Sequence, residues 1–139
     1  MSPWKDASAP SLDDIAVLAE AAFAELPSGF RKQAGDIVFR IDDYPAEQVL
    51  DELGIEDPFE LTGLYQGVDL GRRSVLDPSP EPARIFLYRR PILDEWAERG
   101  DVTLGELVTH VLVHEIGHHF GLSDADIEAI EAEADDDET

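Results

Sequence analysis

The sequence predicts an α+β fold, in which about three strands pack under helices. Residues 37–41 alternate apolar and polar side chains with the two-residue period of a strand, and the stretches 61–70 and 84–88 also have extended patterns. Apolar residues spaced three and four apart indicate helices around these strands. The most regular helix, 104–120, lies near the C-terminus, after all of the expected strands.

Capping residues and helix breakers delimit the expected helices. Ser11 can cap the first helix, and Pro45 and Pro91 can begin two short ones, since the first turn of a helix needs no backbone donor from proline. Gly54 and Gly100 are expected to end these short helices. The expected helices span 11–26, 45–53, 91–99, 104–120 and the residues from 123 onward.

Helix-breaking residues and a run of acidic residues also divide the chain into regions. Pro27 and Gly29 are expected to end the first helix, and three prolines make 74–82 a loop without regular structure. The expected division is a flexible N-terminal arm at 1–10, a single domain at 11–130, and an acidic, disordered tail at 131–139.

The composition argues against several classes of protein. The 139 residues are 43% hydrophobic, which fits one domain with a substantial core. The chain has no cysteine, which excludes disulfides and thiolate zinc sites and is compatible with a reducing cytoplasm. A net charge of −22 opposes binding to nucleic acid or to an anionic membrane surface. With no signal-peptide pattern and no long apolar run, we expect a cytoplasmic protein, and nothing in the sequence fixes its oligomeric state.

One stretch has the residue spacing of a metal site. His114, Glu115 and His118 form the pattern H-E-x-x-H, and Gly121 and Asp124 follow at intervals of three. Residues four apart lie on the same face of a helix, so the two histidines can point ring nitrogens at one zinc ion. Glu115 would then lie beside the zinc, where a coordinated water needs a general base.

The helix that carries this motif has clear start and stop signals. Thr103 and Glu106 form a capping box, and apolar residues follow at helical spacing. Gly121 stands where a helix C-terminus favours a residue with left-handed backbone. The turn that results can bring Asp124 back toward the metal, which makes Asp124 the candidate third ligand.

Each motif residue also has a purely structural explanation. Two histidines four apart are often surface or core residues, and Glu115 alone could be a solvated helix charge. Gly121 would end a helix in any protein. Ser123 can cap a following helix, in which case the Asp124 carboxylate would simply interact with the helix dipole. The metal interpretation rests on the joint occurrence of these residues.

Two further histidines are not expected to bind the metal. His110 lies one turn before His114 on the same face, but ligands spread over two turns would span about 12 Å along the axis. Zinc–nitrogen bonds of about 2 Å cannot bridge that span, so His110 is expected to support a ligand or to line the core. His119 points away from His118 and is expected to be a packing or surface residue.

Together, three segments resemble a known family. The motif H-E-x-x-H-x-x-G-x-x-D, with LTGLYQGVDLGRRS (61–74) and IFLYRRPI (85–92), is similar to the small bacterial zincin-like metallopeptidases, over roughly 12–130. The resemblance implies a minimal zincin fold, with a small sheet and a C-terminal active-site helix. Metzincins share the motif but place a methionine under the zinc after it, whereas the only methionine here is Met1, so an ordinary metzincin is not expected.

The same resemblance implies His114, His118 and Asp124 as zinc ligands and Glu115 as the base. The leading hypothesis is therefore a zinc metallopeptidase acting on a peptide or protein, which would lie along an edge strand, with 84–88 as the candidate. The alternative is a zinc-binding regulatory or interaction module with little or no proteolytic activity.

The alternative draws support from one absence in the sequence. No His, Tyr, Arg or Lys follows Asp124, although such a residue commonly stabilises the oxyanion in zinc peptidases. Upstream candidates for that role are Tyr65, Arg72, Arg73, Tyr88 and Arg89.

Overall fold

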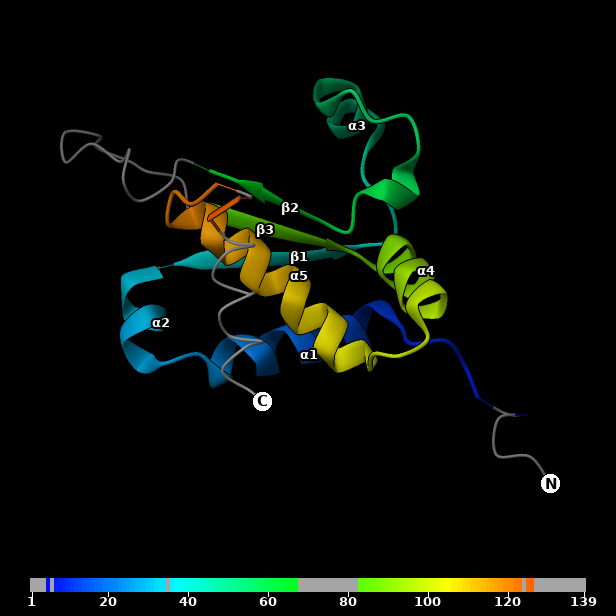
Figure 1. Ribbon diagram of the computed structural model, residues 1–139, viewed down its shortest axis with the longest axis horizontal. Coiled ribbons are helices and arrows are strands. Elements are labelled where there is room, and N and C mark those ends of the chain that lie inside the picture. The colour runs from blue at the N-terminus through cyan, green and yellow to red at the C-terminus, as the bar shows by residue number, and fades with distance from the viewer. Residues whose placement is uncertain (1–4, 6, 35, 68–82, 124, 127–139) are drawn as a thin grey trace.

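A mixed three-stranded sheet forms the centre of the computed structural model, which describes residues 5, 7–34, 36–67, 83–123 and 125–126. The strand order is β1 (Ile37–Asp42), β3 (Ala83–Tyr88), β2 (Gly63–Gln66). β3 pairs in parallel with β1 and antiparallel with β2. The sheet and its helices confirm the predicted α+β class (Figure 1).

Helices form a layer on one side of this sheet. Among the described residues the helices are α1 (Leu12–Glu25), α2 (Ser28–Ala34), α3 (Glu47–Leu53), α4 (Arg89–Arg99) and α5 (Leu104–His119), with a short 3₁₀ helix, η1 (Pro58–Glu60). α1 and α5 pack on each other, α1 against β1 and α5 against β2 and β3. α3 lies above β2 in the view of Figure 1, apart from α1 and α5.

The hydrophobic core fills the space between the sheet and the helical layer. Its buried side chains are Ile15, Ala19 and Ala22 of α1, Ile85 and Leu87 of β3, Ile92 of α4, and Leu107, Val108, Val111, Leu112 and Ile116 of α5. Removal of this apolar surface from water holds α5 against the strands. Among the described residues, no helix is long and apolar enough to span a bilayer.

β1 has the alternation that the sequence predicts, because its odd-numbered side chains are half-buried and its even-numbered ones are exposed. The prediction that 84–88 is an edge strand is wrong, since β3 lies between the other two strands. Alternation along a strand reports which of its faces is buried, whereas strand order depends on pairing between segments remote in sequence. Within the described part of the sheet, the edges are β1 and β2.

Most helix ends follow the predicted signals. Ser11 caps α1, because its Oγ accepts from the Asp14 N–H at 3.1 Å and its own N–H donates to the Asp14 carboxylate at 2.8 Å. α4 starts at Arg89 rather than at Pro91, since a proline anywhere in the first turn leaves no helical hydrogen bond unmade. Gly54 and Gly100 end α3 and α4, as predicted, and both have a left-handed backbone (φ 69° and 71°).

Other predictions are wrong or lie beyond the described residues. The sequence does not predict α2 or η1, and Gly29, expected to end a helix, lies inside α2, because a new helix starts directly after Pro27. Of the predicted strand 61–70, residues 63–66 form β2, and 68–70 lie outside the described residues. The predicted loop 74–82 and the predicted tail 131–139 lie outside the described residues. The limits of the arm and of the single domain remain predictions.

Candidate metal centre

α5 carries the H-E-x-x-H motif at its C-terminal end. The helix begins where predicted, with Thr103 Oγ1 accepting from the Glu106 N–H at 3.1 Å. It runs from Leu104 to His119, one residue short of the predicted end. Its apolar stripe is buried against α1 and the sheet, so the helix cannot rotate without exposing its core residues. The rotation of α5 fixes which way the motif residues point.

A tight turn ends α5 directly after the motif. Gly121 has a left-handed φ of 83°, and its N–H donates to the His118 carbonyl at 2.9 Å. The Leu122 N–H reaches back to the Gly117 carbonyl at 3.0 Å. These two bonds are those of a Schellman motif, which favours glycine at the left-handed position. The predicted role of Gly121 as the residue that ends the helix is confirmed.

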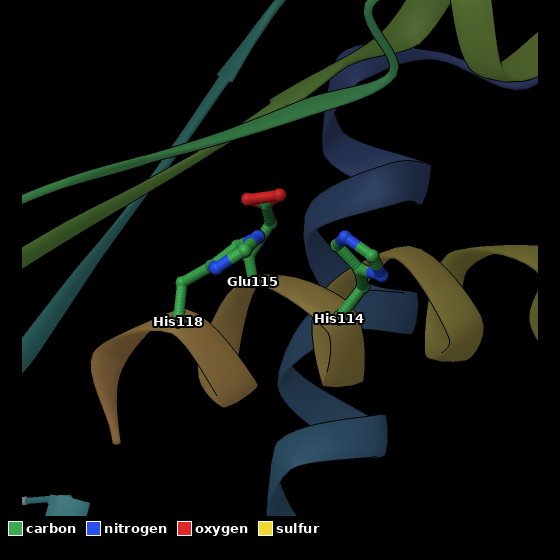
Figure 2. Close-up of side chains that lie close together, drawn as sticks. All are labelled: His114, Glu115 and His118. Carbon is green, nitrogen blue, oxygen red and sulfur yellow. The ribbon is translucent and has the colours of Figure 1, made fainter. Parts of the chain in front are cut away.

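His114, Glu115 and His118 lie together on one side of α5 (Figure 2). One ligand atom from each lies within 4.8 Å of the others, and the two imidazole centroids are 5.0 Å apart. Two nitrogens on one tetrahedral zinc are about 3.4 Å apart, given bonds of about 2.0–2.1 Å, so small side-chain rotations would suffice. Two imidazoles with an adjacent carboxylate are also the donor types that zinc prefers, and the cluster therefore fits this metal.

A backbone carbonyl orients the second histidine. Nδ1 of His118 lies 3.1 Å from the Leu122 carbonyl oxygen. A carbonyl can only accept, so Nδ1 carries the hydrogen and, in the neutral ring, Nε2 keeps its lone pair. Partners of this kind fix the tautomer and ring orientation of metal-binding histidines. The turn at Gly121 places that carbonyl, and this gives the turn a role at the site beyond ending the helix.

Glu115 is buried between α5 and β2. Its side chain is 7% exposed, whereas both histidines are half-buried. Gly63 of β2 packs directly against it, because a Cβ built on Gly63 would lie 3.3 Å from Glu115 Cγ. The same Cβ would lie 2.8 Å from Val111 Cγ1, which is closer than packed atoms tolerate. The strand can approach the helix this closely only because residue 63 has no side chain.

Two hollows meet at the cluster, and both are lined by His114 and Glu115. The smaller, of about 190 Å³, includes Glu95, Arg99 and His110. The larger, of about 540 Å³, also includes His118. Its remaining lining residues are Leu53, Leu61, Gly63, Leu64, Tyr65 and Gly67. A ligand that reached the cluster could therefore extend to either side of it.

The other two histidines of α5 have different surroundings. His119 is fully buried, and its Nδ1 is 2.8 Å from the Tyr65 hydroxyl, which confirms a packing role. His110 is exposed and faces the smaller hollow. The alternative that His110 lines the core is therefore wrong, because His110 is turned to the hollow and not to the sheet.

Asp124, the candidate third ligand, lies outside the described residues. Its neighbours form the cap that the sequence predicts for a following helix. The Ser123 N–H donates to the Asp126 carboxylate at 3.1 Å, and Ser123 Oγ accepts from the Asp126 N–H at 3.2 Å. Both Ser123 and Asp126 are thereby engaged in capping.

The candidate oxyanion donors differ in where they lie. Arg89 is bound to the Asp43 carboxylate at 3.1 Å and to the Pro10 carbonyl at 2.5 Å. Tyr88 is buried; burial, with the negative charges of Asp42 and Glu115, raises the pKa of Tyr88 to about 12. Arg72 and Arg73 lie outside the described residues. Among the described candidates, Tyr65 is the one that lines a hollow shared with the motif.

The fold and the cluster define a class of protein: a small α+β domain in which an H-E-x-x-H helix packs on a mixed sheet. The family model for zincin-like metallopeptidases matches residues 34–134, and the chain belongs to this family. The match includes all three strands and α5. No curated protein matches the chain at a significant level.

Proposed function

We propose that this protein is a zinc-dependent peptidase whose metal is held by His114, His118 and Asp124. The observation that carries the proposal is the convergence of His114, Glu115 and His118, with ligand atoms within 4.8 Å of one another, on the helix of a zincin-like metallopeptidase. Asp124 enters through the sequence, because a turn at Gly121 can bring it back toward the metal, and through the resemblance. Zinc bound there supplies Lewis acidity, which lowers the pKa of a coordinated water toward about 7 and polarises the peptide carbonyl.

Glu115 is the proposed general base. Its carboxylate takes the proton of the attacking water and later passes it to the leaving amine. The support for this role is its position beside both histidines, in surroundings where only 7% of its side chain meets solvent. Low exposure strengthens the interaction of the carboxylate with nearby positive charge and with the reacting water.

The substrate is a peptide that we place along β2 and not along β3. β2 is an edge strand in the described sheet and packs on α5, and its backbone lines the larger hollow at Gly63. An extended peptide that paired with this edge would pass the His114–His118 face of α5 and gain main-chain hydrogen bonds. Tyr65 of the same strand is the proposed hydroxyl donor to the oxyanion, a role that requires His119 Nδ1 to donate in its 2.8 Å contact with this hydroxyl.

Metal content tests the proposal directly. Purified protein should carry about one zinc per chain by elemental analysis, and His114→Ala and His118→Ala should each lose it. His110→Ala is the matched control, because His110 lies on the same helix and lines a hollow without belonging to the cluster. Zinc retained by the double variant His114→Ala/His118→Ala would overturn the assignment.

A further inference from the structure

Two polar side chains of α5 are buried, Glu115 and His119. The proposed function accounts for Glu115, but it gives His119 no task. Nδ1 of His119 lies 2.8 Å from the hydroxyl oxygen of Tyr65, and the two ring centroids are 5.5 Å apart. A buried polar group needs a hydrogen-bonding partner, because burial without one costs free energy. Here the partner is the residue proposed to donate to the oxyanion.

The hydroxyl end of Tyr65 lies at the wall of the larger hollow. Side chains two apart on a strand share a face, so Tyr65 points to the same side as Gly63, toward α5. Gly67 comes so close to the ring that a Cβ built on it would lie 3.1 Å from the Tyr65 hydroxyl oxygen. Gly67, Tyr65 and His118 all line the larger hollow. His119 and the Gly67 backbone therefore bound the hydroxyl beside the cavity that reaches the metal cluster.

The hydrogen in the contact between Tyr65 and His119 can come from either residue. A tyrosine hydroxyl donates one hydrogen and can also accept, and one nitrogen of a neutral imidazole donates while the other accepts. If Nδ1 accepts, the hydroxyl hydrogen points at His119 and not at a ligand. If Nδ1 donates, the hydroxyl can turn its hydrogen toward the hollow. The hydrogen on His119 therefore decides whether Tyr65 can act on an oxyanion.

We propose that His119 is a positioning residue, which donates its Nδ1 hydrogen to the Tyr65 oxygen and leaves the hydroxyl hydrogen facing the larger hollow. This inference rests on the proposed function. His119 lies on the same helix as His114 and His118, so the bond ties the proposed oxyanion donor on β2 to the element that carries two of the proposed metal ligands. A donor held in place before the reaction needs no reorganisation when negative charge develops.

Nitrogen NMR of the histidine rings tests the position of the hydrogen without any cleavage. Long-range correlations between the ring nitrogens and the carbon-bound ring hydrogens distinguish a protonated nitrogen from a bare one, and sequential assignment identifies the His119 ring. In the zinc-loaded protein, Nδ1 of His119 should be protonated. A bare Nδ1 would overturn the proposal, because the hydroxyl would then be the donor in this contact.

A double-mutant cycle tests whether His119 acts through Tyr65. On a peptide that the wild type cleaves, His119→Phe should lower kcat by about tenfold or more and change KM little, because the oxyanion forms only in the transition state. In a Tyr65→Phe background the same change should have no further effect. His119→Asn should recover much of the lost rate, since its amide nitrogen can take a position close to that of Nδ1 and donate.

The outcomes separate positioning from packing. If His119→Phe lowered kcat equally with and without the Tyr65 hydroxyl, His119 would only support the fold, and the inference would fail while the zinc assignment stood. Denaturant unfolding and zinc content show whether each variant is folded and loaded. If His119→Phe did not fold, the NMR measurement on the wild type would still decide. A wild type that bound no zinc would contradict the proposed function, and the inference with it.

Discussion

Gly63 of β2 lies so close to α5 that a Cβ at this position would stand 3.3 Å from Cγ of Glu115 and 2.8 Å from Cγ1 of Val111. The strand proposed to receive the substrate and the residue proposed as general base are thus in direct packing contact. A glycine inside a strand weakens the strand, and close approach of another element is a common reason for its presence. The position of the Glu115 side chain therefore depends on the absence of a side chain at Gly63.

Gly63→Ala should therefore affect both stability and the site. Overpacking of this kind costs about 1–3 kcal/mol, measurable by denaturant unfolding, and the added methyl should displace the Glu115 side chain and lower the rate of peptide hydrolysis. Gly105→Ala is the control on α5, because its Cβ would meet only Leu18 at 3.8 Å, an ordinary contact. A Gly63→Ala variant as stable and as active as the Gly105→Ala variant would refute the packing argument.

Gly121 is predicted to affect zinc affinity through the Leu122 carbonyl. Alanine at the left-handed φ of 83° costs about 1–2 kcal/mol, and relaxation of the turn should move that carbonyl away from Nδ1 of His118. Loss of such a supporting hydrogen bond typically lowers metal affinity by about 10–100-fold. Competition with a zinc chelator measures this affinity in the Gly121→Ala variant.

The matched control for Gly121 is Gly100, which ends α4 with a similar φ of 71° and lines neither hollow. Gly100→Ala should lose comparable stability and keep its zinc affinity. If both variants lowered zinc affinity equally, general destabilisation and not the position of the carbonyl would be responsible.

Asp124 and Asp126 should separate ligation from capping. Asp124→Ala should weaken zinc binding markedly, since the turn at Gly121 and the resemblance both make Asp124 the candidate third ligand. Asp126→Ala removes the carboxylate that accepts from the Ser123 N–H, so it should cost at most about 1 kcal/mol of stability and leave zinc affinity unchanged. Chelator competition and denaturant unfolding on both variants decide this. Equal loss of zinc affinity in the two would identify Asp124 as a capping residue.

The sequence predicts α5 and its motif closely because the determining signals are local. Thr103 caps the helix, Gly121 ends it, and residues four apart share a face whatever the rest of the chain does. The convergence of His114 and His118 could therefore be predicted before the fold was known. The three strands could also be predicted, since apolar patterning follows the burial of each face.

Features that depend on long-range contacts could not be predicted in the same way. The position of β3 in the middle of the sheet arises from pairing with both β1 and β2. Leu53 lines the larger hollow because of the way the chain runs through α3 and η1, and no local sequence pattern indicates this position. Gly63 is a signal that the sequence does contain, because a lone glycine in a strand indicates close approach of another backbone. The sequence does not show, however, that the neighbour of Gly63 is Glu115.

The most direct test of the central claim is Glu115→Gln in a peptide-library cleavage assay, with zinc content measured on the same samples. Glutamine keeps the shape of the side chain and its hydrogen bonding but cannot accept the proton. Zinc content should stay the same, while hydrolysis falls by about 10²–10⁴-fold, the usual contribution of a positioned acid–base group. A Glu115→Gln protein that holds zinc and cleaves as fast as the wild type would contradict the account. A zinc-loaded wild type that cleaves no peptide in the library would instead favour a zinc-binding module.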